Sequence, residues 1–341
     1  MKMILNAELL ENVDRQQWAQ FVHFHPHGRV FQTPFFYKSV HESGEWQPLG
    51  ICLKDEQDKI IGLLCAYLQR EGDGIRGKMS SRSVIFGGPL VKEEQSIIYI
   101  KLIKAYEEKI KKKAIYTQFR NLRDLSDHKK TFSTLGYQYK EHLNIHVDLT
   151  KTEDELWKEV HSKRKNEIRR ARREGVTFLV EDSSEALDAC RKILEEVYSR
   201  ARLPYPSHGF FHSLHRNSSD RQGLRIFTAR REGKIIGCML GLVYRETIYD
   251  FYAGSLRRYY RYYPNDLIPW EVFLWGKRHG YQVFDFGGAG KPDVPYGVRD
   301  YKKKFGGEFV NFGRFQKIHK PVLMGIARKG FKIWQKIQRP K

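Results

Sequence analysis

Three consecutive lysines, Lys302, Lys303 and Lys304, stand between an aromatic residue and a Phe-Gly-Gly turn. They end the segment FDFGGAGKPDVPYGVRDYKKKFGG, residues 284–307, which begins as an apolar, strand-like run. Ammonium groups beside glycines suit a cradle for a phosphate or an oxyanion, because a fixed cation stabilises developing negative charge. A solvated loop is the other interpretation of such a charge run. The elements around the segment must distinguish the two.

Basic side chains are also concentrated in the middle of the chain, in TEDELWKEVHSKRKNEIRRARREGVTF. Thr152 and Glu155 fit a capping box at the start of a helix, and Gly175 would end it. Same-sign charges at this density repel one another unless an anion neutralises them, so we favour contact with a polyanion over a solvated surface. The candidate nucleic-acid contacts are Lys163, Arg164, Arg169, Arg170 and Arg173.

The whole chain is basic, with 61 Lys and Arg against 40 Asp and Glu and a formal net charge of +21. Such a charge favours polyanionic partners: nucleic acid, phosphorylated small molecules or an anionic membrane face. The N-terminal apolar run is too short for a signal peptide, and no stretch approaches the roughly 20 apolar residues of a spanning helix. We therefore expect a cytoplasmic monomer, with peripheral attachment to the inner membrane face left open.

Cysteine and histidine spacings predict neither a disulfide framework nor a metal site. The cysteines have no short paired spacing, so we interpret them as small buried hydrophobic residues. They are Cys52, Cys65, Cys190 and Cys238. Two histidine groups have regular spacing, but no carboxylate or cysteine partner is evident near them in the sequence. The groups are His23, His25 and His27, and His208, His212 and His215.

The two halves of the chain repeat one order of elements. ICLKDEQDKIIGLLCAYL (51–68) aligns with IFTARREGKIIGCMLGLV (226–243), each an apolar strand, a charged turn and Lys-Ile-Ile-Gly leading into a second strand. A further strand, a helix and a strand follow each hairpin, and another strand follows those. This predicts an α/β fold of two similar domains with mixed sheets. Each half resembles the GNAT acyltransferase fold.

One feature of GNAT proteins that use acetyl-CoA is missing. The resemblance implies a glycine-rich loop at a helix start, whose backbone N–H groups would hold the CoA pyrophosphate. The corresponding stretch, LRRYYRYYPND (256–266), contains no glycine. Tandem GNAT-like halves without this loop, together with VYSRARLPYP, DFYAGS and DFGGAG…YKKKFGG in that order, resemble the Fem family of aminoacyltransferases. The family transfers amino acids from aminoacyl-tRNA to the peptide stem of peptidoglycan precursors.

The resemblance implies roles for several cations. Lys302 matches the family's Phe-Lys pair, with Tyr301 in place of the preceding aromatic residue, and would stabilise the charged intermediate of acyl transfer. Arg200 matches a phosphate-binding arginine, with Arg202 an equal candidate, and a guanidinium suits bidentate phosphate contact. Lys38 in FQTPFFYK is a looser match to the same precursor phosphates. For each, a solvated surface position is the alternative.

Two further side chains suit acyl transfer. Asp285 could orient the attacking amine or accept its proton, or could instead be a buried aspartate that accepts backbone N–H bonds. Tyr252 could hydrogen-bond the acceptor or belong to the core. Gly287 and Gly288 would let the main chain approach a substrate closely.

We therefore expect an acyltransferase that moves an amino acid from aminoacyl-tRNA onto an amine of a phosphorylated cell-wall precursor, with no cofactor of its own. One alternative is an acyl-CoA-dependent GNAT-type N-acyltransferase with an atypical CoA site. Another is a non-catalytic binder of nucleic acid or membrane surface. The expected divisions are residues 1–150 for the acceptor-side domain, 151–320 for the catalytic half and 321–341 for a basic amphipathic helix that lies on an anionic bilayer or packs on its own domain.

Overall fold

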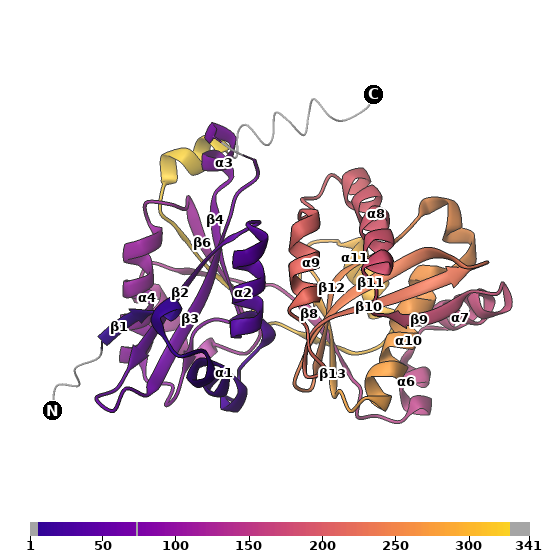
Figure 1. The fold of residues 1–341 in the computed structure, drawn as a ribbon, viewed down its shortest axis with the longest axis horizontal. Coiled ribbons are helices and arrows are strands. Elements are labelled where there is room, and N and C mark those ends of the chain that lie inside the picture. The colour runs from indigo at the N-terminus through magenta and orange to yellow at the C-terminus, as the bar shows by residue number, and fades with distance from the viewer. Residues whose placement is uncertain (1–5, 73, 328–341) are drawn as a thin grey trace. The chain divides into compact units, whose positions relative to one another are not determined.

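A computed structural model describes residues 6–72 and 74–327 of the chain (Figure 1). The chain forms two compact units. Unit 1 combines Met1–Glu141 with Phe312–Lys341, and unit 2 is His142–Asn311. Each unit has its own mixed β-sheet with helices on its faces, so the predicted α/β architecture of two domains is present in the described residues.

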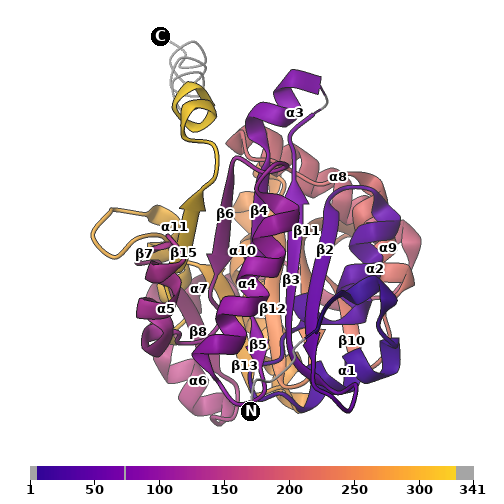
Figure 2. The same ribbon diagram turned by 90° about the vertical axis from the view of Figure 1, so that its left-hand side faces the viewer.

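The described part of unit 1 has an eight-stranded sheet in the order β1-β2-β3-β4-β6-β15-β7, with β5 beside β3. Its strands are β1 (Asn6–Leu9), β2 (Gln47–Lys54), β3 (Ile60–Gln69), β4 (Arg82–Phe86), β5 (Leu90–Val91), β6 (Tyr116–Arg120), β7 (Gln138–Lys140) and β15 (Arg314–Ile318). Its α-helices are α1 (Arg15–Phe24), α2 (Pro34–Ser43), α3 (Gly74–Ser80), α4 (Ser96–Ile110) and α5 (Lys129–Thr134). Figure 2 shows α4 running along the sheet, where Tyr99, Leu102 and Tyr106 are buried against it.

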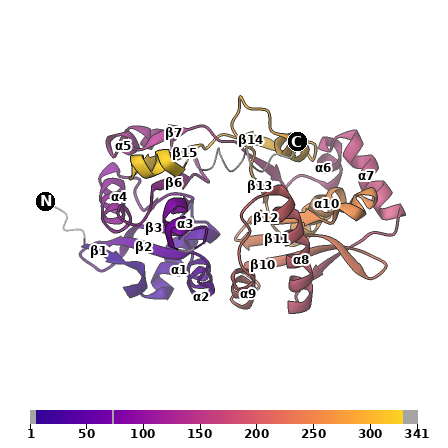
Figure 3. The same cartoon turned by 90° about the horizontal axis from the view of Figure 1, so that it is seen from above.

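The described part of unit 2 has a seven-stranded sheet in the order β14-β8-β13-β12-β11-β10-β9. Its strands are β8 (Asn144–Asp148), β9 (Thr177–Glu181), β10 (Gln222–Arg231), β11 (Lys234–Tyr244), β12 (Thr247–Ser255), β13 (Val283–Gly288) and β14 (Glu308–Val310). Its helices are α6 (Glu153–Glu159), α7 (Ser162–Arg173), α8 (Ser184–Ala201), α9 (His208–Arg216), the 3₁₀-helix η4 (Arg257–Tyr262), α10 (Pro264–Arg278) and α11 (Gly297–Lys303). Figure 3 shows α8 and α10 on different sides of this sheet.

The predicted repeat is a pair of antiparallel hairpins, β2–β3 and β10–β11. The glycine that ends each Lys-Ile-Ile-Gly run lies where a helix comes closest to the sheet. A Cβ on Gly62 would lie 2.9 Å from Leu102 of α4, and one on Gly237 would lie 3.0 Å from Pro264 of α10. The repeated glycine is therefore explained by close helix packing in both units.

Alanine at Gly237 or Gly62 is expected to destabilise the protein by about 1–3 kcal/mol, because the new methyl group overlaps a packed helix. Denaturant unfolding would measure the change. Gly325→Ala is the matched control, since its Cβ would meet no atom within 4 Å. Equal stability of the Gly237 and Gly325 variants would show that α10 shifts at no cost, contrary to this account.

Two short strands follow each repeat, β7 and β8 in the first half and β14 and β15 in the second, and the second strand of each pair joins the sheet of the other unit. β8 lies between β13 and β14 of unit 2, whereas β15 lies between β6 and β7 of unit 1. The division predicted at residues 150 and 320 put each of these strands in the opposite domain, so the observed units are divided differently. The reason is topological: a strand's sequence pattern marks one buried face but not the sheet edge that it joins.

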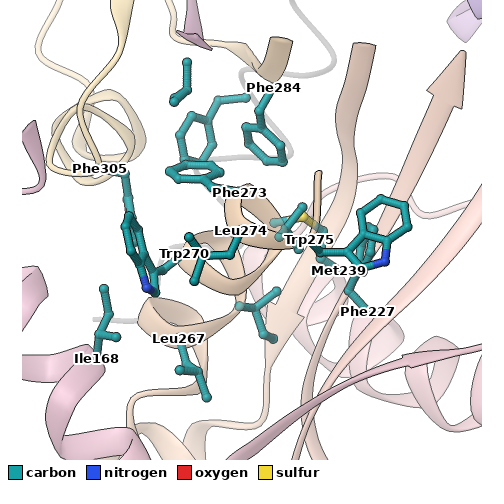
Figure 4. Packing of buried hydrophobic residues seen from close by; sticks show 14 of the residues in the cluster. Ile168, Phe227, Met239, Leu267, Trp270, Phe273, Leu274, Trp275, Phe284 and Phe305 are labelled. Carbon is teal, nitrogen blue, oxygen red and sulfur yellow. The ribbon is translucent and has the colours of Figure 1, made fainter. Parts of the chain in front are cut away.

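A cluster of aromatic side chains fixes α10 in unit 2 (Figure 4). Phe273 is fully buried, and its ring centroid lies 5.0 Å from that of Phe284 on β13 and 6.4 Å from that of Phe305. Phe305 lies two residues after the end of α11, and its ring centroid lies 5.8 Å from that of Phe286. The same core therefore holds both β13 and the end of α11, which carries the lysine triplet.

Other predictions concern the cysteines and the chain's end. All four cysteines are free and buried, which confirms their interpretation as core residues. Residues 321–327 are helical, with Met324 buried, and the remainder of the predicted C-terminal helix lies outside the described residues. In the part of the chain that the structure describes, the helices are too short or too polar to cross a bilayer.

Candidate active site in unit 2

The parallel strands β12 and β13 share a hydrogen-bond ladder over only part of their length. The ladder ends at Tyr249 and Asp285, although β12 continues to Ser255 and β13 to Gly288. Main-chain groups of β13 beyond this point need other partners, because buried backbone groups are rarely left unpaired. Four of the predicted site residues meet here: Lys302, Asp285, Gly287 and Gly288.

Lys302, in the last turn of α11, supplies one of those partners. Its ammonium group donates a hydrogen bond to the carbonyl oxygen of Phe286 and lies 3.4 Å from that of Gly288. The next lysine behaves differently: Lys303 is exposed, and its Nζ donates to the carbonyl oxygen of Gly307 at 2.6 Å. Of these two neighbours, only Lys302 is directed toward β13.

Asp285 is buried and accepts hydrogen bonds. Its Oδ1 accepts from the Gly287 amide at 2.7 Å, and its carboxylate lies 3.4 Å from both His146 Nε2 and Asn144 Nδ2. Burial would raise the pKa of Asp285, but the bonds from His146 and Gly287 and the charge of Lys302 outweigh it and hold the pKa below its usual value. Gly287 adopts φ +70°, which glycine accommodates without strain. Acceptance of a backbone N–H bond, one of the two predicted roles, is thus observed.

Asp250 is a member of the site that sequence reasoning missed. It directly follows the last residue of β12 that pairs with β13, and burial raises its pKa to about 6, with Lys302 opposing the rise and Asp285 adding to it. A carboxylate with this pKa can exchange a proton near neutral pH. The sequence feature that could have identified Asp250 is its position in DFYAGS, two residues before Tyr252.

Tyr301 anchors α11 to the start of α10. Its hydroxyl donates to the carbonyl oxygen of Asn265 at 2.5 Å, and its ring centroid lies 5.3 Å from that of Phe305. Burial raises the pKa of Tyr301 well above its usual value, so the hydroxyl keeps its proton. This geometry gives Tyr301 a positioning role for the neighbouring Lys302.

Tyr252 lies in a cluster of aromatic rings between β12, α8 and α9. Its ring centroid is 5.3 Å from that of Tyr198 on α8 and 5.1 Å from that of Phe211 on α9. Phe251 is the extra residue of a β-bulge in β12. Leu240 of β11 pairs with Tyr252 and the next residue of β11 pairs with Asp250, so Phe251 has no partner in this register. Tyr252 is only partly buried, so these ring contacts are compatible with both of its predicted roles.

The two predicted phosphate-binding cations lie in different units. Arg200, at the end of α8, is exposed and donates to the Tyr260 hydroxyl at 2.8 Å. Lys38, on α2 of unit 1, is also exposed and lies 3.6 Å from Glu42 one turn on. Both positions are accessible to a phosphate.

The predicted nucleic-acid residues lie on α7, but they do not share one environment. Arg164 points inward, with its side chain 12% exposed, and pairs with Asp266 and, at 2.9 Å, with Glu167. Lys163, Arg169, Arg170 and Arg173 are exposed. Two shallow depressions lie along this face. Their shared lining residues are Asn166 and Arg173.

The comparisons with known proteins agree with this fold. The acetyltransferase (GNAT) domain family matches residues 160–303. A UDP-N-acetylmuramoylpentapeptide-lysine N(6)-alanyltransferase of Weissella viridescens is 25% identical over 306 residues, 84% of this chain and 86% of that protein. The crystal structure of FemX superposes with a TM-score of 0.71 at 15% identity, covering 94% of this chain and 100% of FemX. A tandem GNAT protein from the clavulanic acid pathway has a TM-score of 0.60 at 11% identity, covering 92% and 98%.

The chain is thus an acyltransferase built of two tandem GNAT-like domains, as its repeated elements predict. It is similar in sequence to the Weissella alanyltransferase and in fold to FemX, which confirms the predicted resemblance to the Fem-type aminoacyltransferases.

Proposed function

We propose that this protein transfers an amino acid from aminoacyl-tRNA to an amine of a peptidoglycan precursor. The observation that carries the proposal is the position of Lys302, half-buried at the end of the β12–β13 ladder within electrostatic reach of two carboxylates. The Weissella relative is named as an alanyltransferase that acts on the lysine of a UDP-linked muramoyl pentapeptide. A precursor of this class carries both a phosphate group and an acceptor amine.

The residues of the site suit each step of aminolysis. The acceptor amine forms a bond to the ester carbonyl carbon, and negative charge collects on the carbonyl oxygen. An ammonium group has three N–H donors, so Lys302 keeps one for that oxygen beyond its two contacts with β13. Asp250 accepts the proton that the amine loses. The ester C–O bond then breaks, and the leaving ribose oxygen takes up the proton that Asp250 accepted, which restores the carboxylate.

The exposed face of α7 is the proposed contact for the tRNA. Arg170 stacks near Tyr263, with its guanidinium carbon 5.3 Å from the ring centroid, and Arg173 lines both depressions beside it. Cations interleaved with aromatic rings suit phosphate contact and base stacking. Arg164 is left out of this surface, because its charge is already compensated by Asp266 and Glu167.

Charge reversal at Lys163 and Arg173 is expected to weaken binding of aminoacyl-tRNA and to reduce the salt dependence of log K by about one unit for each phosphate that the protein no longer neutralises. The matched control reverses Lys104 and Lys130, two exposed lysines of unit 1, with the same change in net charge. Filter binding at several salt concentrations would compare them. Equally weakened binding in both double variants would contradict a specific role for α7.

The runner-up is transfer from acyl-CoA, which the match to the GNAT domain family favours. The start of α10 speaks against it. The helix begins directly after Tyr263, which adopts φ +56°, and no glycine precedes it there. Its first turn carries the buried carboxylate of Asp266. A pyrophosphate would meet a negative group where glycine-rich loops offer only backbone N–H donors. Saturable binding of an acyl-CoA in calorimetry would reverse the preference.

The decisive experiment incubates the protein with a mixed pool of charged tRNAs and peptidoglycan precursors, including UDP-linked pentapeptide, and analyses the precursors by mass spectrometry. A gain of one amino-acid mass is expected, and its size identifies the donor. Absence of any gain with both soluble and lipid-linked precursors would overturn the proposal. Because charged tRNA is a cytoplasmic substrate, the proposed reaction takes place in the cytoplasm.

A further inference from the structure

Three side chains capable of binding a metal converge on the outer side of the α8–α9 pair. Asp188 belongs to α8, and His208 and His212 lie one turn apart on α9. The Asp188 Oδ1 lies 2.8 Å from His208 Nε2 and 3.0 Å from His212 Nε2. The three ligand atoms all lie within 4.8 Å of one another. The carboxylate partner that the histidine spacing lacks in the sequence is thus supplied by another helix.

We propose that Asp188, His208 and His212 form a binding site for a divalent transition-metal ion of the zinc class. Two imidazoles at i and i+4 on one helix with a carboxylate from a second element are a ligand set that suits zinc. The proposal concerns a surface distinct from the residues of the acyl-transfer site and does not rest on the proposed function.

The distances suit a metal ion with small adjustments. Tetrahedral zinc with bonds of about 2.0–2.1 Å separates its ligand atoms by roughly 3.3–3.4 Å. The observed carboxylate–imidazole separations of 2.8 and 3.0 Å are a few tenths of an ångström shorter. Side-chain rotation alone would open this space, because the three side chains are 42%, 54% and 24% exposed, in the order Asp188, His208, His212. That exposure leaves a fourth position for water.

The arrangement of the two rings also suits a metal ion. The imidazole rings of His208 and His212 stack with centroids 4.0 Å apart, and the Asp188 carboxylate lies against both. One metal ion binds both rings in their neutral form and is compensated by the carboxylate. Arg191, a cation one turn along α8 from Asp188, is itself paired with Glu195 at 2.9 Å.

A metal ion at this site would link α8 to α9 in unit 2. Asp188 and His208 enclose most of α8 and the segment 202–207, which contains Arg202 in the left-handed conformation. Closing this stretch by a metal would restrict its motion. We therefore infer a structural ion that stabilises the packing of α8 against α9. The same packing includes the ring contacts of Tyr205 with Tyr198 and with Phe211.

The test uses the full chain without an affinity tag, freed of metal by a chelator and titrated with Co²⁺ as a spectroscopic probe. We expect one Co²⁺ per chain, with visible ligand-field bands of four- or five-coordinate cobalt that disappear when Zn²⁺ displaces it. The melting temperature should rise with Zn²⁺ concentration, because the ion binds the folded state. Absence of stoichiometric Co²⁺ and Zn²⁺ binding would overturn the proposal.

Variants locate the site. His212→Ala and Asp188→Asn should each weaken Co²⁺ binding by more than the roughly 10–100-fold that loss of an outer-shell partner costs. His215→Ala is the matched control, because His215 lies on the same helix but pairs with Asp182 at 3.2 Å. It should leave both the stoichiometry and the spectrum unchanged. Loss of the bands in His215→Ala, or their persistence in His212→Ala, would show that the ion binds elsewhere. Unchanged circular dichroism confirms that each variant is folded.

Discussion

Replacement of Lys302 by alanine is expected to lower kcat of the proposed transfer by about 10²–10³-fold, the loss typical when one donor to an oxyanion is removed. KM for both substrates should change little, because the proposed bond to the carbonyl oxygen strengthens only as charge develops. Rapid-quench measurement of amino-acid transfer from charged tRNA to the precursor would give both constants.

Lys303→Ala is the matched control for this experiment. It removes the same charge from the next residue of α11, but its ammonium group bonds Gly307 and lies 5.0 Å from the Phe309 ring centroid, away from β13. Its activity should stay within a few-fold of the natural protein. Comparable losses in the two variants would mean that the net charge of the segment matters and not the position of Lys302.

A structural role for Lys302 makes a different prediction from a catalytic one. Its bonds to Phe286 and Gly288 contribute to the stability of β13, so Lys302→Ala also lowers the melting temperature. The pH profile separates the roles. Lys302 opposes the rise in the pKa of Asp250, so its removal should move the acid limb of the activity profile to higher pH. A lower melting temperature with an unmoved acid limb and unchanged kcat would leave Lys302 a structural residue.

The repeated part of the fold could be predicted from sequence because its signals are local. Lys-Ile-Ile-Gly marks the start of a strand after a tight turn, and its glycine is required by helix packing in both units. The sequence could not predict that β8 pairs in the sheet of unit 2 and β15 in the sheet of unit 1, because tertiary packing decides which strands pair. The inward direction of Lys302 depends on the Phe305 and Tyr301 contacts, which the sequence suggests only as aromatic neighbours.

The missed residues have a common physical cause. Asp250 acquires its raised pKa from burial beside Asp285 and Lys302, which are far from it in the sequence. Asp188 meets His208 and His212 across two helices. In both cases the chemistry arises from convergence of distant segments. Sequence patterns can identify each side chain as a candidate, but they do not identify the neighbouring group that changes its properties.

Asp250→Asn is expected to remove activity and to stabilise the protein at neutral pH. The pKa of Asp250 is about 6 in the folded protein against 3.8 without its surroundings, so the folded state binds a proton more tightly than the unfolded chain. Above pH 6 the natural protein therefore carries an unfavourable carboxylate that the amide lacks. The difference amounts to at most about 3 kcal/mol in the free energy of unfolding at pH 7–8. It should shrink as the pH falls from 6 to 4, where the folded state takes up the proton and the unfavourable charge disappears.

Asp285→Asn should behave in the opposite way, which makes the pair of variants decisive. The pKa of Asp285 is lowered in the folded protein, so its carboxylate stabilises the fold above its unfolded pKa, and this contribution is lost as the pH falls through the folded pKa. Asparagine at 285 is therefore destabilising at pH 7, whereas asparagine at 250 is stabilising. Denaturant unfolding at pH 4.5 and pH 7.5 would measure both differences. If Asp250→Asn also destabilised the protein at pH 7.5, its carboxylate would be a favourable partner of Lys302 in the folded state, and the case for a proton acceptor held at a raised pKa would fail. Stabilisation together with a loss of transfer of about 10²–10⁴-fold is the result that a general base at this position requires.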